Sequence, residues 1–199
     1  MRYLPLFIDT CGRKALVVGG GRAAAIKIKT LLKTELTVEV YAREICEEIT
    51  SLESDRLILH PGHEAGEDLP LTEADLLIIA FSGPGADALR AKADSLGLWT
   101  LRCDSPGGGD FHLGMSYTRE PVTVAAHTGG LGPTVGRAIA KDLQASVDAI
   151  DLERFRQLGR IRRHLIDSGL HGKALSDKME LLLTLPVDEL RALEESYEY

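Results

Sequence analysis

The chain has 199 residues, of which 44% are hydrophobic, and a formal net charge of −7 at pH 7. This length and composition allow one packed core with a smaller appended part, and the acidic balance argues against nucleic acid as the main partner. No run approaches the roughly 18 to 20 apolar residues of a membrane span, and the N-terminal residues lack the layout of a signal peptide. We therefore expect a cytoplasmic protein with neither a membrane nor a nucleic-acid partner.

The first predicted elements are a strand, a glycine turn and a helix. An apolar run over residues 15–18 is typical of a buried parallel strand, and Gly19-Gly20-Gly21 separates it from a stretch of good helix formers. Gly19 would make the tight turn that leaves the strand, and Gly21 would let a pyrophosphate approach the backbone. Ala24 would take the third small position, where the helix packs on the strand.

A second strand-like run over residues 36–41 follows after one helix length and completes a βαβ unit. Phosphates would lie on the free N–H groups of the first helical residues, Arg22 and Ala23, because the helix dipole favours negative charge there. The pattern therefore predicts dinucleotide binding. The alternative is an ordinary glycine turn in another kind of α/β protein.

The end of the second strand bears on the choice of dinucleotide. A site for NAD usually places an acidic residue there to hold the ribose hydroxyls, but this sequence has Tyr41, Ala42 and Arg43, with Glu39 slightly early. Arg43 either accepts the 2′-phosphate of NADP or lies at the surface. We expect NAD as the cofactor, with NADP left open, and Tyr41 and Ala42 among its contacts.

The next elements extend the parallel sheet. Residues 43–56 are expected to be helical and residues 57–59 to form a short strand, while residues 75–81 are the most strand-like run and a candidate central strand. Ser82 and Gly83 then turn the chain toward another helix. Ligands of an open α/β sheet bind at the carboxyl ends of its strands, so we expect Ser82 and Gly83 beside the first glycine turn, in contact with the dinucleotide.

The rest of the chain moves from strands to helices. A strand over residues 99–103 would place Asp104 at the same ligand-binding edge, and a strand over 122–126 precedes a second glycine turn that opens a helix near Pro133. The apolar lead, residues 1–13, is expected to lie against the sheet. Further helices are expected over residues 148–168, 173–183 and 186–196.

Histidines and cysteines give no metal or disulfide pattern. His60 and His63 have no further ligands nearby, so we expect them in an exposed turn after an edge strand. Cys11, Cys46 and Cys103 are odd in number and far apart, which indicates separate thiols rather than a disulfide framework or a zinc cluster.

With these elements in order, the chain resembles the precorrin-2 dehydrogenase / sirohydrochlorin ferrochelatase family, a bifunctional module that also forms the N-terminal half of siroheme synthase. The resemblance covers roughly residues 1–145 and rests on the order and spacing of several short pieces. These pieces are Leu4-Pro5-Leu6-Phe7, Val17-Val18-Gly19-Gly20-Gly21 with Ala24 and Lys27, Cys103-Asp104, Phe111, Val122-Thr123-Val124-Ala125, Thr128-Gly129-Gly130, Pro133 and Arg137.

The resemblance implies an α/β fold and a reaction. A Rossmann-like NAD-binding domain would occupy residues 1–113, a dimerisation region 114–147 and a small all-helical C-terminal domain 148–199, assembled as a homodimer. NAD⁺ would take a hydride from the tetrapyrrole precorrin-2 to give sirohydrochlorin. In bifunctional members the same cleft then inserts a metal, so Fe²⁺ or Co²⁺ would be a further substrate.

The candidate site combines the glycine turn with this resemblance. Asp104 is the implied catalytic group, because a carboxylate beside the nicotinamide can take the proton that accompanies hydride departure; the alternative is an aspartate that caps a turn. The expected cofactor contacts are Gly19, Gly21, Arg22, Ala23, Tyr41, Ala42, Ser82 and Gly83. The expected substrate contacts are His127, Thr128, Gly129 and Gly130.

Five residues depart from the family pattern in the expected tetrapyrrole cleft: Ile26, Leu101, Gly114, His127 and Gly132. His127 is a proton acceptor, a transient metal ligand or a hydrogen-bonded packing residue, and His112 has the same alternatives. Three functions stay open at this point: a dehydrogenase that also chelates metal, a dehydrogenase that hands its product to a separate chelatase, and a non-catalytic NAD-sensing domain.

Overall fold

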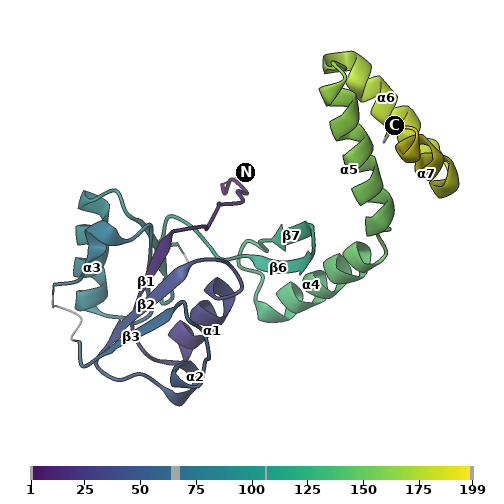
Figure 1. Ribbon diagram of the computed structural model, residues 1–199. Helices are drawn as coiled ribbons and strands as arrows, with labels where there is room; N and C mark the ends of the chain where they lie inside the picture. The colour runs from purple at the N-terminus through teal and green to yellow at the C-terminus, as the bar shows by residue number, and fades with distance from the viewer. Residues whose placement is uncertain (1, 64–67, 106, 198–199) are drawn as a thin grey trace. The chain divides into compact units, whose positions relative to one another are not determined.

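The computed structural model describes the chain except for residues 1, 64–67, 106 and 198–199 (Figure 1). It divides into two compact units, which are described separately. The first unit comprises Met1–Ser116 and Ala125–Gly136, and the second comprises Tyr117–Val124 and Arg137–Tyr199. The separate dimerisation region expected over residues 114–147 stays a prediction.

A parallel sheet of five strands, in the order β3-β2-β1-β4-β5, forms the centre of the first unit. The chain builds β1, β2 and β3 toward one edge and then crosses back to β4 and β5 on the other side of β1. The carboxyl ends of β1 and β4 therefore form a topological switch point, the usual place for a nucleotide in such sheets. The strands are β1 (Lys14–Val18), β2 (Thr37–Ala42), β3 (Leu57–Pro61), β4 (Leu76–Ile79) and β5 (Trp99–Arg102).

Helices cover both faces of this sheet, as predicted for a Rossmann-like fold. Figure 1 shows α1 (Arg22–Leu31) and the short α2 (Glu47–Thr50) on one side and α3 (Pro84–Ser95) on the other. Successive side chains of a strand point to opposite faces, so each strand contributes to two cores. Ala15, Val17, Val38, Val40 and Ile78 pack on the α1 side, whereas Leu16, Val18, Leu77 and Ile79 pack on the α3 side.

Two predictions for the first unit are wrong. The helix expected over residues 43–56 shrinks to the single turn of α2, because the backbone of Glu44 and Ile45 packs on the glycine turn and Cys46 donates its N–H to the carbonyl of Gly20. The lead does not cover the sheet: its side chains from Leu4 to Phe7 are largely exposed. Helices α1 and α3 already cover the two faces of the sheet, and the lead meets the sheet near its amino ends, where Ile8 and Arg13 line a hollow with Leu76 and Trp99.

A two-stranded hairpin and a long helix continue the chain after the parallel sheet. The hairpin consists of β6 (Met115–Arg119) and β7 (Val122–Ala126), and α4 (Pro133–Asp148) follows. The strand β7 and the start of α4 match the sequence-based expectation, but β6 was not predicted. Its sequence, MSYTR, has no apolar run that would signal a buried strand, although Tyr and Thr are common in strands, and its pairing with β7 defines it.

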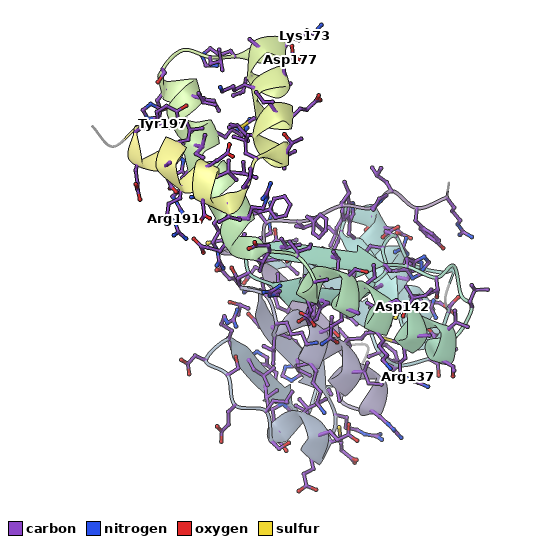
Figure 2. The ribbon with its side chains drawn as sticks, turned by 90° about the vertical axis from the view of Figure 1, so that its right-hand side faces the viewer. Arg137, Asp142, Lys173, Asp177, Arg191 and Tyr197 are labelled. Carbon is purple, nitrogen blue, oxygen red and sulfur yellow. The ribbon has the colours of Figure 1, made fainter. Side chains whose placement is uncertain are left out.

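Three helices close the chain near the predicted positions: α5 (Leu152–Asp167), α6 (Gly172–Thr184) and α7 (Val187–Glu195). Leucines and Ile161 form their common core, while Figure 2 shows the polar Lys173, Asp177 and Arg191 on these helices, where all three are exposed. Asp151 caps α5 by accepting the N–H of Arg154 at 3.1 Å. Among the described residues, no helix is long and apolar enough to cross a membrane.

Candidate active site

The first glycine turn has the geometry that the sequence predicts at Gly19. Its φ is +117°, and an added Cβ would lie 2.8 Å from the carbonyl oxygen of Ala80. Gly20 is equally restricted, because a Cβ there would collide with the carbonyl of Glu44, a requirement that the sequence motif alone did not reveal. The turn lies so close to the backbone that follows the two neighbouring strands that neither position accepts a side chain.

The N-terminus of α1 fits the pyrophosphate of a dinucleotide. A Cβ added to Gly21 would meet open space, no side chain caps the helix, and its first turn contains no acidic residue. Arg22 and Ala23 are exposed, whereas Ala24 is fully buried against the strands, as expected for the third small position. The first-turn N–H groups lack intrahelical partners, so this end of α1 can receive an anion.

The turn after β4 lies beside this helix end. The N–H of Ala80 donates to the carbonyl of Val18, which joins the ends of β4 and β1. Ser82 and Gly83 follow, both exposed, and Gly83 with a φ of +101° precedes an α3 that also lacks a side-chain cap. The end of β4 thus lies next to the glycine turn, and the contact of Ser82 and Gly83 with the dinucleotide stays a prediction.

The side chains at the end of β2 contact one another and do not face an open ligand site. The Tyr41 hydroxyl donates to Glu39 at 3.0 Å, and the Tyr41 ring stacks on His60 with centroids 4.1 Å apart. Burial and the adjacent carboxylate raise the pKa of Tyr41 to about 12. Glu39 also pairs with Lys14 at 2.7 Å. Glu39 is therefore not available to a ribose.

The carboxylate of Asp104 lies at the expected edge but is held by an arginine. Arg102 donates from Nε and Nη2 to its two oxygens at 3.0 and 2.6 Å, and it also pairs with Asp87 of α3. The Arg102 guanidinium holds the pKa of the Asp104 carboxyl below its ordinary value. Asp104 is thus an ionised group on the α3 side of β5. No local sequence pattern indicates Arg102 as its partner.

The side chains of Cys103 and of residues 111–113 lie at the same edge of the sheet, on its α1 side. Cys103 packs against the core on the α1 side, together with the neighbours of His112 in the chain, Phe111 and Leu113. The rings of His112 and His127 lie 4.9 Å apart, and Tyr3 approaches both with its ring. The fold therefore brings together two histidines that lie 15 residues apart in the sequence.

The second glycine turn follows His127 directly. Gly129 and Gly130 have φ values of +63° and +93°, and an added Cβ at either would meet open space. The N–H of Gly129 points to Nδ1 of His127 at 3.3 Å, and Leu131 donates to the carbonyl of Thr128. This open turn before α4 agrees with the expected one, and its contact with a substrate stays a prediction.

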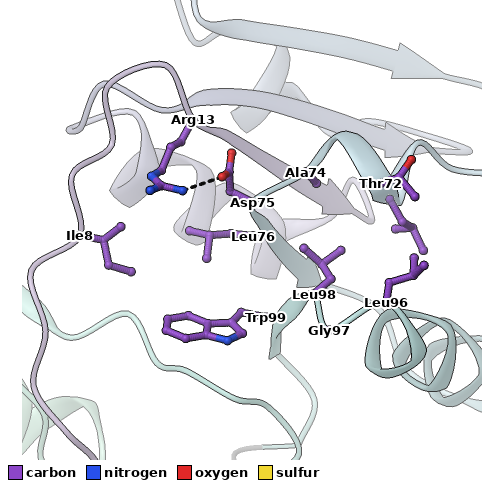
Figure 3. A pocket seen from close by; sticks show the side chains of 11 residues that line it. Ile8, Arg13, Thr72, Ala74, Asp75, Leu76, Leu96, Gly97, Leu98 and Trp99 are labelled. Atoms are coloured by element: carbon purple, nitrogen blue, oxygen red, sulfur yellow. Dashed lines mark hydrogen bonds and ion pairs between the residues drawn. The ribbon is translucent and has the colours of Figure 1, made fainter.

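A hollow of about 500 Å³ lies at the other end of the sheet (Figure 3). It is lined by Leu76 and Trp99, the first residues of β4 and β5, and by Arg13, which pairs with Asp75 at 2.7 Å. Since these are amino ends of parallel strands, the hollow is remote from the glycine turn. It is therefore not the candidate active site.

Within the described residues, no group of three or more histidine, cysteine or acidic side chains could hold a metal ion. His60 and His63 lie at the edge strand β3, as predicted, but His60 belongs to the strand and is stacked on Tyr41 rather than exposed. The three cysteines are free thiols.

The sequence is similar to a family of NAD(P)-binding domains and to several siroheme synthases. The sequence model of a family described as putative NAD(P)-binding matches residues 6–115. Siroheme synthase from Nitrosomonas europaea is 30% identical over 148 residues, which are 74% of this chain and 31% of that protein. Siroheme synthase 1 from Yersinia enterocolitica is 29% identical over 177 residues, 85% of this chain and 37% of that protein. The chain thus spans about a third of the length of these relatives.

The fold likeness extends over the whole chain. The solved structure of SirC, precorrin-2 dehydrogenase, superposes with a TM-score of 0.71 and 19% sequence identity, covering 98% of this chain and 99% of that one. The glycine turn, the open helix end and the family match agree on NAD(P) as the cofactor. Because the matched residues make up more than half of the chain, the protein belongs to the family of putative NAD(P)-binding domains.

Proposed function

We propose that this protein catalyses the NAD-dependent dehydrogenation of precorrin-2 to sirohydrochlorin. The observation that carries the proposal is the whole-length likeness to a precorrin-2 dehydrogenase, which includes the second unit as well as the nucleotide-binding one. The relatives named siroheme synthase support the same tetrapyrrole chemistry. An NAD-sensing domain would need only the first glycine turn, so it leaves the hairpin and the helical part without a role.

The residues at the carboxyl edge would divide the work. Bound NAD⁺ supplies a hydride acceptor. The N-terminus of α1, with Gly21, Arg22 and Ala23, would hold its pyrophosphate, with Ser82 and Gly83 beside it. Asp104 would face the reacting edge as a fixed negative charge, since Arg102 keeps it ionised.

Substrate binding would use the second glycine turn. Thr128 can donate its hydroxyl to a substrate carboxylate, and the open surface at Gly129 and Gly130 leaves room for a macrocycle. Arg119 is not available for this purpose, because its Nη1 donates to the carbonyls of Val147, Asp148 and Ile150 and so holds the end of α4.

The test is an anaerobic incubation of the protein with precorrin-2 and NAD⁺, followed by absorbance of NADH and of the tetrapyrrole, and then addition of Fe²⁺ or Co²⁺. NADH formation is expected. NADH without faster metal insertion identifies a dehydrogenase that leaves chelation to another protein. Tight NAD⁺ binding without NADH formation would contradict the proposal and favour the sensing domain.

Substitution of Asp104 tests whether metal insertion uses the same cleft as the dehydrogenation. If the same cleft inserts metal, Asp104→Ala should abolish insertion, because the cleft loses the fixed negative charge that attracts the incoming metal cation. Asp55→Ala is the matched control, since Asp55 is exposed and precedes β3 at the opposite end of the sheet. Unchanged insertion by Asp104→Ala would exclude a chelatase role for this residue.

A further inference from the structure

We infer that His112 and His127 act as a pair that accepts the proton released when precorrin-2 gives its hydride to NAD⁺. This inference rests on the proposed dehydrogenation and assigns it a base. The two rings belong to separate segments, after β5 and after β7, yet their centroids lie 4.9 Å apart with planes tilted by 33°. Tyr3 packs edge-on against both, at 4.7 Å and 5.0 Å, and fixes their positions.

One nitrogen of the pair lacks a partner. Nε2 of His112 is buried and accepts or donates no hydrogen bond within the described part of the chain. Buried polar atoms are normally paired, so such an atom at a ligand-binding edge indicates that a ligand completes it. His127 is oriented by the main chain: its Nδ1 accepts the N–H of Gly129, so the neutral ring carries its proton on Nε2.

The surroundings disfavour protonation of His112 before substrate binds. Burial lowers the pKa of His112, and the positive charges of His127, Lys27 of α1 and Arg2 of the lead lower it further. A polycarboxylate such as precorrin-2 brings negative charge to this positive cluster, and that charge raises the pKa of a nearby imidazole. His112 would therefore have a lower proton affinity in the free protein and gain proton affinity when substrate is bound.

The alternative base, Asp104, is less suited to the task. Two hydrogen bonds from Arg102 stabilise its ionised form and lower its pKa. A base works best when its pKa lies near the working pH, which an imidazole satisfies and a carboxylate held by a guanidinium does not. Asp104 would then orient or polarise the reacting edge.

The step balances in atoms and electrons. A C–H bond of the macrocycle breaks and its electron pair leaves with the hydrogen as hydride to NAD⁺, which is reduced to NADH. A second hydrogen leaves as a proton to the unpartnered Nε2 of His112, and its electrons form the new double bond of sirohydrochlorin. His112 then releases this proton to solvent, which reaches the pair at the exposed His127.

The test compares His112→Gln, His127→Gln and the double variant with the unaltered protein. Glutamine keeps a nitrogen donor near the position of Nε2 but does not titrate in this range. We expect kcat for NADH formation to fall at least about 100-fold in the double variant, and the acidic limb of its pH profile to disappear. His171→Gln is the control, because His171 is exposed at the start of α6.

Binding of NADH, followed by its fluorescence, shows whether each variant is folded and should match the unaltered protein. A double variant that keeps both kcat and the acidic limb would overturn the inference alone. An unaltered protein that forms no NADH would overturn the proposed function, and this inference with it.

A second measurement needs no variant. Ring ¹⁵N shifts of the unaltered protein, titrated with and without sirohydrochlorin, should show a higher pKa for His112 in the complex. An unchanged pKa would contradict the inference.

Discussion

Substitution by alanine should lower the stability of the protein much more at Gly20 than at the adjacent Gly21. Gly20→Ala should destabilise the protein by about 2 to 3 kcal/mol or more, because its Cβ would collide with the backbone of Glu44. Gly21→Ala should cost less than about 1 kcal/mol, since its Cβ meets open space and its φ of −91° suits alanine.

Gly21→Ala, which should change stability little, should have a clear effect on the binding of NAD⁺. Gly21→Ala should weaken NAD⁺ binding about tenfold, because the methyl group occupies the approach of the pyrophosphate to the backbone. Urea unfolding and calorimetric titration give the two quantities. A Gly20→Ala protein with unaltered stability would contradict the described turn.

The buried carboxylate of Glu39 should make stability depend on pH. Burial opposes its ionisation, but hydrogen bonds from Lys14 and Tyr41 outweigh this and lower its pKa below the ordinary value of 4.5. Its stabilisation is therefore complete above pH 4.5 and is lost as the pH falls through the lowered folded-state pKa.

Glu39→Gln should reduce the free energy of unfolding at pH 7 by about 1 to 3 kcal/mol and flatten the loss of stability below pH 4.5. Glu53→Gln, at an exposed position before β3, is the control. Equal acid sensitivity of the Glu39→Gln and unaltered proteins would show that this network does not set the dependence.

Residues whose role depends on local backbone could be predicted, and those that depend on distant contacts could not. The turn at Gly19 and the packing of Ala24 follow from a strand, a turn and a helix within one short stretch. The need for glycine at position 20 depends on the return of residues 44–46 to the turn. The pairing of His112 with His127 requires the tertiary fold for the same reason.

The helical part depends on a small apolar core that one residue can test. Leu182 is 1% exposed in the core of α5, α6 and α7, whereas its neighbour Leu181 is 56% exposed. Leu182→Ala should therefore destabilise this part by about 3 kcal/mol, and Leu181→Ala by less than about 0.5 kcal/mol. Urea unfolding followed by helical circular dichroism measures both, and equal effects would contradict the described packing.

Elements with strong internal periodicity were predictable. The helices α5, α6 and α7 repeat apolar residues at helical spacing between clear breaks at Gly169 and Pro186. Residues 43–56 carry similar spacing at Ile45, Ile49 and Leu52, yet only α2 forms, because the start of the segment is used to pack on Gly20. Periodicity indicates which side chains can be buried together. The contact between the backbone of residues 44–46 and Gly20 determines where the helix begins.

The whole molecule is expected to be a homodimer. The hairpin of β6 and β7 forms a sheet of only two strands, and such a sheet is marginally stable by itself. Pairing with a second copy would extend it. Sedimentation should give twice the mass of one chain, and the unfolding temperature should rise with protein concentration. A monomer with a concentration-independent unfolding temperature would contradict this expectation.

The proposed reaction transfers a hydride from precorrin-2 to NAD⁺ on this protein. The most direct measurement follows both chromophores under strict anaerobic conditions, with the protein in catalytic amount and precorrin-2 limiting. NADH and sirohydrochlorin should appear together in equal amounts, at a rate proportional to protein concentration. Sirohydrochlorin formation no faster than without protein, with NAD⁺ bound but not reduced, would contradict it.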